Sequence, residues 1–248
     1  MLTLVACGDN STNSEPETRT PPEVPNLQTY QPDTDFFQQT VQKVVQTTNG
    51  YQLAQTVVTG TVDPLFMLPN LYLQFYTGAG GTDAEFSNGM WEWTYSYSYG
   101  GESVEIRRTV AESANQYTWA VYISYSGTQG PSFDNYKLME VTTSAEGDVG
   151  TWNLYPFETE SDETILSMDW DYSDENNQEA NYLFSDEEGV EQFDIAYSNQ
   201  DADFSILIES SDSDPILVNW NEDTNEGLIE SEGETLCWDS TLNDVACS

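Results

Sequence analysis

The strict alternation in residues 91–99 constrains the fold more than any other feature of the chain. Aromatic residues occupy every second position from Trp91 to Tyr99, and Glu, Thr or Ser fills the positions between them. Successive side chains of a β-strand point to opposite faces of the sheet, so this period of two predicts a strand with one aromatic and one polar face. The same period recurs later in the segments Tyr117/Trp119/Val121/Ile123, Leu166/Met168/Trp170, Phe193/Ile195/Tyr197, Phe204/Ile206/Ile208 and Ile216/Val218/Trp220.

Short turn signals separate these alternating segments. They are rich in Gly, Asn, Asp and Pro, as in residues 100–101, 146–147, 199–201 and 232–233, and we count about eleven or twelve short strands between them. No helical interval separates the strands, so strands that are consecutive in the sequence should pair antiparallel. We predict a single mainly β domain over residues 33–248, an antiparallel up-and-down meander that forms a highly curved sheet or a barrel with its aromatic face inward. A β-sandwich is the alternative.

One N-terminal helix is expected to precede the strands. Residues 33–35 can cap a helix over 35–47, in which the apolar residues at positions 37, 41, 44 and 45 form one stripe. Asn49 and Gly50 should end this helix. Residues 51–77 are apolar without a clear period, and they fit buried turns of either helix or strand.

The charge balance excludes several classes of function. The chain has 44 acidic residues, five Lys or Arg and no His, which gives a net charge of −39. Five cations cannot build a nucleic-acid-binding face, and without His there is no imidazole base and no His-ligated zinc. No base follows Lys137, so the many later acids must be solvated or screened by salt. A halophilic habitat is the simplest explanation.

The acidic residues themselves give little evidence of chemistry. Pairs two positions apart, such as Asp169 and Asp171, are as frequent as so acidic a chain gives by chance, and a glycosidase would need two such acids in a cleft. The segment 169–180 has Asp174 and Ala180 where an EF-hand loop needs Gly and Glu. We therefore expect no catalytic residues, no cofactor and no dedicated metal site, only weak binding of divalent cations at acidic turns.

The beginning of the chain has the features of a targeting segment rather than of a folded element. Leu4, Val5 and Ala6 precede Cys7, and residues 8–32 are polar and contain five prolines. Leu4-Val5-Ala6-Cys7 resembles a bacterial lipobox, in which a signal peptide is cleaved before a Cys that then carries lipid. The resemblance implies a residual signal segment over 1–6, lipidation at Cys7 and a disordered tether over 7–32. It also implies a lipid-anchored protein of the cell envelope, and Gly8 favours the outer membrane, on its periplasmic or surface side.

The other two cysteines fit an exported protein. Cys237 and Cys247 bracket the segment 238–246, and two short strands around a turn would bring them within the distance of a disulfide. An oxidising compartment outside the cytoplasm permits that bond. We predict a disulfide between them.

Arg108 is the most informative charged residue for binding. In the segment 104–110 it shares the face of Val104, Ile106 and Val110, so its guanidinium should point inward unless a bulge turns it out. Inward, it could anchor an acidic head group or pair with an internal carboxylate. The candidate ligand-binding set is Arg108, Trp91, Trp93, Tyr95 and Trp119.

Two functions stay open at this point. The first is a lipid-anchored, non-catalytic envelope protein that holds an apolar small molecule in an aromatic-lined barrel interior. The second is a surface lipoprotein that binds another envelope protein or a glycan through its exterior. Buried, the aromatic residues 91–99 are core; exposed, they make a stacking platform for sugars. A carboxylate-dependent hydrolase is a remote third possibility.

Overall fold

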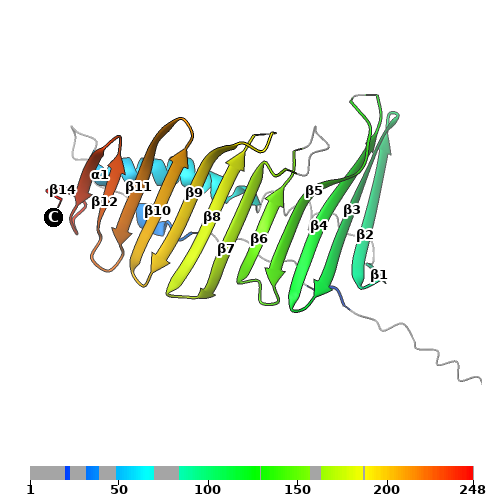
Figure 1. Cartoon of the computed structure of the whole chain (residues 1–248), viewed down its shortest axis with the longest axis horizontal. Helices are drawn as coiled ribbons and strands as arrows, with labels where there is room; N and C mark the ends of the chain where they lie inside the picture. Colours follow the sequence, from blue (N-terminus) through cyan, green and yellow to red (C-terminus); the bar gives the residue numbers. More distant parts are fainter. Residues whose placement is uncertain are drawn as a thin grey trace, which may run out of the picture.

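The computed structural model describes residues 20–22, 32–38, 49–69, 84–128, 130–156, 163–186 and 188–247. Within them, fourteen strands form one antiparallel sheet, and each strand pairs with its neighbours in sequence (Figure 1). The two end strands, β1 and β14, do not pair with each other, so the sheet formed by the described strands is open. The prediction of a mainly β antiparallel meander is confirmed, and a single sheet replaces the alternative of a two-sheet sandwich.

The shortest strands lie at the two edges of the sheet. Their bounds are β1 (Glu85–Ser87), β2 (Met90–Tyr99), β3 (Glu102–Ser113), β4 (Gln116–Ser126), β5 (Phe133–Ser144), β6 (Val149–Leu154), β7 (Leu166–Asp174), β8 (Asn177–Ser185), β9 (Glu191–Gln200), β10 (Asp203–Ser210), β11 (Ser213–Asn221), β12 (Glu226–Ser231), β13 (Glu234–Trp238) and β14 (Asp244–Val245).

The register of the strands aligns apolar residues in rows that cross the sheet. One row of consecutive register partners is Trp91, Val110, Trp119, Val141, Trp152, Met168, Tyr182, Ile195 and Ile208. Every member is at most 5% exposed. We call the face that carries this row the inner face. Most acids of the strands occupy the alternate positions, on the outer face, as the alternation in the sequence predicts.

Helical segments cover the inner face of the later strands. They are η2 (Asp35–Gln38), α1 (Gly50–Val57), η3 (Val58–Val62) and α2 (Asp63–Phe66), and Figure 1 shows them behind the sheet. Phe36 and Phe37 pack on Trp220 of β11, with ring centroids 6.3 and 5.0 Å away. Tyr51 packs on Trp238 of β13, and Phe66 on Tyr182 of β8. We call β8–β13 with these segments the helix-covered end.

The helical segments differ from the prediction where the structure describes them. Of the predicted helix 35–47, only 35–38 lies within the described residues, and it forms a single 3₁₀ turn. Asn49, expected to end a helix, instead begins α1, because its side-chain oxygen accepts a hydrogen bond from the backbone N–H of Gln52 at 2.8 Å. Asn serves equally well before a helix and after one, so local sequence did not decide between the two. No described helix is both long and apolar enough to cross a membrane.

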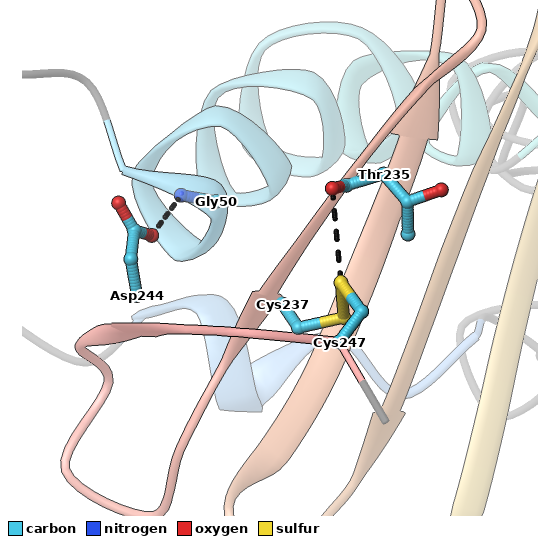
Figure 2. Close-up of a disulfide and its surroundings, with 5 residues drawn as sticks. All are labelled: Gly50, Thr235, Cys237, Asp244 and Cys247. Carbon is cyan, nitrogen blue, oxygen red and sulfur yellow. Dashed lines mark hydrogen bonds between the residues drawn. A yellow bond between two sulfur atoms is a disulfide. The ribbon is translucent and has the colours of Figure 1, made fainter.

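The predicted disulfide between Cys237 and Cys247 is present, with Cα atoms 5.3 Å apart (Figure 2). The register partner of Cys237 is Val245, so the bond joins β13 to the chain two residues beyond β14. The same hairpin holds α1, since the carboxylate of Asp244 accepts a hydrogen bond from the backbone N–H of Gly50 at 2.8 Å. A carboxylate at a helix N-terminus is electrostatically favourable. The disulfide therefore closes the hairpin on which α1 begins.

Candidate functional site

The aromatic residues of β2 pass from buried to exposed along the strand. Trp91 is 3% exposed and belongs to the core, whereas Tyr97 and Tyr99 are 68% and 76% exposed. Trp93 and Tyr95, between them, are partly buried. The two interpretations of this segment therefore apply to different parts of the same strand: core at its beginning, an exposed row of rings at its end.

Neighbouring strands extend the exposed rings into a surface. Tyr97 is in register with Val104 of β3, which is in register with Tyr125 of β4, and Tyr125 with Phe133 of β5. The rings of Tyr125 and Phe133 lie 5.7 Å apart. These residues lie on the inner face, at the end of the sheet opposite the helix-covered end. We call this surface the tyrosine face: Tyr95, Tyr97, Tyr99, Val104, Ile106, Tyr125 and Phe133.

Arg108 lies at the base of the tyrosine face. It is in register with Trp93 and Val121 without a bulge, and it is only 7% exposed. Of the two orientations considered, the structure therefore shows the inward one. The guanidinium lies 4.7 Å from the ring centroid of Tyr95 and 5.3 Å from that of Trp93. Its Nη2 donates a hydrogen bond to the hydroxyl of Tyr95. These cation–π contacts and this hydrogen bond fix the Tyr95 ring.

A carboxylate is fixed at the rim of the tyrosine face. Glu102 is the register partner of Tyr99, and its carboxylate accepts a hydrogen bond from the hydroxyl of Tyr125. The backbone N–H and the hydroxyl of Thr128 also donate to it, at 3.1 and 2.9 Å. These donors hold an oxygen acceptor in one orientation beside the exposed ring of Tyr99. Rings and an ordered polar group side by side are the usual composition of a small-molecule site.

The outer face of the same strands carries the other two described cations. Arg107 lies 4.0 Å from the ring centroid of Tyr122 and forms an ion pair with Glu92 at 3.1 Å. Lys137, also in register with Tyr122, pairs with Glu140 at 3.3 Å. Every Lys or Arg in the described part of the chain thus lies on β3 or β5. This end of the sheet carries far less net negative charge than the other.

The predicted binding residues divide into two groups. Trp93, Tyr95 and Arg108 lie together at the tyrosine face, whereas Trp91 and Trp119 are at most 3% exposed in the core. Sequence reasoning considered an exposed row of rings only for the whole of 91–99, without separating Tyr97 and Tyr99 from the buried part, and it did not indicate Tyr125 and Phe133 as part of a surface. Their alternation was visible, but it does not reveal where the cover over the inner face ends. Cys7 lies outside the described residues.

The acid pair noted in the sequence lies elsewhere, on the outer face of β7. Asp169 and Asp171 line a groove of about 600 Å³ together with Glu179 and Asn181. Burial raises the pKa of the Asp169 carboxyl, while hydrogen bonds from the hydroxyl and backbone N–H of Ser173 lower that of Asp171. Within the described residues, His, Cys, Asp and Glu nowhere form a group of three suited to a metal ion.

Comparison of the chain with protein-family models, with curated proteins and with solved structures gives no match. The candidate site therefore depends on its own geometry. That geometry consists of the exposed rings of Tyr97 and Tyr99 with half-buried rings on β4 and β5 beside them, one fixed carboxylate at the rim and one buried cation at the base.

Proposed function

We propose that this protein is a lipid-anchored, non-catalytic envelope protein that binds neutral carbohydrate through the tyrosine face. The observation that carries the proposal is the exposure of Tyr97 and Tyr99, 68% and 76%, on the strand whose Trp91 is buried in the core. Contiguous exposed aromatic surface on a soluble domain commonly marks an interaction site.

The chemistry of the tyrosine face suits a sugar. The flat face of a pyranose carries C–H groups that pack on aromatic rings, and tyrosine adds a hydroxyl that can donate to a sugar oxygen. The carboxylate of Glu102, held by Thr128 and Tyr125, can accept from a sugar hydroxyl. With a net charge of −39, the protein repels acidic polymers. The ligand class is therefore a neutral glycan.

Two sequence features support the envelope location. The segment before Cys7 resembles a lipobox, and the disulfide between Cys237 and Cys247 is typical of exported proteins. The intact mass of protein purified from its own membranes tests this part. A mass that includes a lipid at Cys7 and the loss of two hydrogens at the disulfide is expected, and an unmodified Cys7 would contradict the anchor.

A protein ligand is the second candidate, because tyrosine is enriched at protein interfaces and Tyr97 and Tyr99 are exposed here. An apolar ligand held inside a closed barrel has less support. The sheet of described strands is open, and the core residues of its central row are at most 5% exposed.

Co-sedimentation of the full chain with insoluble neutral polysaccharides, such as cellulose, chitin and starch granules, tests the ligand class. Retention on at least one of them is expected, together with its loss in the variant Tyr97→Ala/Tyr99→Ala. Met67→Ala is the matched control, since Met67 is 62% exposed at the helix-covered end. Absence of retention on every polysaccharide, or equal retention of the double variant, would refute carbohydrate binding at the tyrosine face.

A further inference from the structure

Among the described strands, only β1 covers the outer edge of β2, and it covers only the first three residues. β1 pairs only with residues 90–92 of β2, while β3 pairs with the whole strand on the other side. Within the described part of the chain, residues 94–99 therefore have a strand neighbour on one side only. The backbone N–H and C=O groups of alternate residues point away from β3 at this edge and can accept another strand.

This edge lacks the features with which natural sheets block such pairing. Charged side chains, proline and bulges are the usual protections. Residues 94–99 contain no charge and no proline, and their register with β3 continues without a shift. At the opposite edge of the sheet, β14 pairs with Cys237 and Trp238, so only residues 234–236 of β13 lack a described outer neighbour, and they include the charged Glu234. The β2 edge is the more favourable place to add a strand.

The sequence of the edge is complementary to itself. Residues 95–99 read Tyr-Ser-Tyr-Ser-Tyr in both directions. If two copies pair antiparallel about a twofold axis at Tyr97, then Tyr95 faces Tyr99 of the other copy and Ser96 faces Ser98. Every tyrosine then faces a tyrosine on the inner side, and every serine a serine on the outer side. Such aromatic and hydroxyl pairs across strands are stabilising, and a twofold interface requires this self-complementarity.

The charge distribution favours the β2 edge as the place where two copies of the chain can meet. With −39 charges per molecule, two copies repel each other at any strongly acidic surface. The edge at residues 94–99 is uncharged. Of the described cations, Arg107 and Arg108 lie on the adjacent strand β3, and Lys137 lies two strands further in, on β5. The β2 edge is therefore where two copies approach with the least repulsion.

We infer that two copies of this protein associate through antiparallel pairing of their β2 strands. The two sheets then continue into each other, and the two tyrosine faces join into one surface of twice the length. Binding of carbohydrate to that joined surface rests on the proposed function, whereas the pairing of the strands does not. The Debye length falls from about 10 Å at 0.1 M salt to about 3 Å at 1 M, so the association strengthens with salt.

Sedimentation velocity of the full chain, at several concentrations in 0.05 M and 2 M NaCl, measures the association. A reversible dimer is expected, with a dissociation constant at least about tenfold lower in 2 M salt, since screening weakens the repulsion of two like-charged chains. A monomer at every concentration and salt level would overturn the inference. The readout is mass, so this result is independent of whether any glycan binds.

A pair of charge variants locates the interface. Tyr97→Lys and Tyr97→Glu each place like charges opposite each other across the twofold axis, so each variant alone should be monomeric. Their equimolar mixture places opposite charges there and should restore a dimer. Ser198→Lys is the matched control, because it adds the same charge on the exposed side of β9 and should leave the dimer intact. Dimers of either single variant, or a monomeric mixture of folded variants, would contradict pairing at Tyr97.

Amide hydrogen exchange in residues 94–99 distinguishes a second copy of the chain from another segment of the same chain as the neighbour of this edge. Protection that increases with protein concentration is expected for pairing between copies. Full protection of these amides in dilute monomer would show that another segment of the same chain covers the edge, and it would overturn the inference.

Discussion

The two ends of the sheet carry similar aromatic residues on the same inner face, in opposite environments. At the helix-covered end, Trp220 is 2% exposed beneath Phe36 and Phe37. At the other end, Tyr97 is 68% exposed although it continues the same alternation. Strand periodicity therefore determines which face a side chain occupies, and a separate segment of chain determines whether that face is buried.

The ends also differ in charge. All described cations lie on β3 and β5, and the strands from β6 to β14 contain only acids among their charged residues. At the helix-covered end, apolar side chains buried on the inner face stabilise the fold, and the acidic side chains on the outer face are solvated by water. The tyrosine face has lower net charge beneath and beside it, which makes it the end that other molecules can approach.

The same type of substitution at each end gives the sharpest comparison. Trp220→Ala removes an indole packed against Phe36, Phe37 and Phe204 and should lower the free energy of unfolding by about 3–5 kcal/mol. Tyr97→Ala should change it by no more than about 0.5 kcal/mol, because the ring is mostly exposed. Urea denaturation followed by tryptophan fluorescence measures both. Equal losses would mean that the tyrosine face is packed in solution.

The disulfide should stabilise one end selectively. Closing the loop between Cys237 and Cys247, which are ten positions apart in the sequence, contributes about 2–3 kcal/mol in the chain-entropy model. The double variant Cys237→Ser/Cys247→Ser should lose this amount, and amide exchange should increase in β13 and at the start of α1, which Asp244 holds. Exchange in β3 and β4 serves as the internal control. A uniform increase across the sheet would show that the two ends unfold as one unit.

Two glycines test how tightly the helix-covered end is packed. A Cβ added at Gly227 would lie 2.2 Å from Cζ2 of Trp238 and 2.4 Å from the carbonyl oxygen of Asn219, so Gly227→Ala should cost about 1–3 kcal/mol through overpacking. Gly60→Ala is the matched control in the helical run. Nothing lies within 4 Å of its added Cβ, and alanine should stabilise the helix by about 0.5–1 kcal/mol. Thermal unfolding measures both, and a neutral Gly227→Ala would contradict the close approach of the indole.

Much of the fold could be predicted because its determinants are local. The alternation around Trp91 and the turn glycines fix strand, face and hairpin, since each depends on a few adjacent residues. The spacing of Cys237 and Cys247 likewise allowed the disulfide to be predicted. The same alternation offered an inward Arg108 but could not exclude a bulge or strand end that turns the side chain outward; the unbroken register on both sides of β3 decides for the inward orientation.

The features that sequence reasoning missed depend on distant contacts. Asn49 begins a helix because residues 50–66 pack on the apolar surface of β8–β13. The sequence near Asn49 contains no indication of that packing. The exposure of Tyr97 and Tyr99 depends on where that cover ends. The open sheet, in place of a barrel, depends on whether β1 can reach β14, a property of the accumulated twist of all the strands.

The smallest effect concerns pH and is again expected at the helix-covered end. Burial raises the pKa of Asp63; the negative charge of Asp35 adds to this rise, and the hydrogen bond from the Thr34 hydroxyl opposes it. Burial also raises the pKa of Glu222, and the negative charge of Asp33 adds to that rise. Between the ordinary carboxyl pKa, about 4, and these raised values, the folded state binds more protons than the unfolded chain. The free energy of unfolding therefore falls as pH rises through that window, so the protein should be more stable at pH 5 than at pH 7.

Neutralising substitutions assign this dependence to its residues. Asp63→Asn and Glu222→Gln should each reduce the difference in unfolding free energy between pH 5 and pH 7, because the neutral side chain no longer titrates. Glu112→Gln, at the exposed end of β3, should leave that difference unchanged. Asp171 and Asp239, whose hydrogen bonds lower their pKa values, act in the opposite sense: their contribution to stability is lost as the pH falls below about 4. A difference that all three substitutions reduce equally would show that general charge repulsion, rather than burial beneath the helices, governs the pH response.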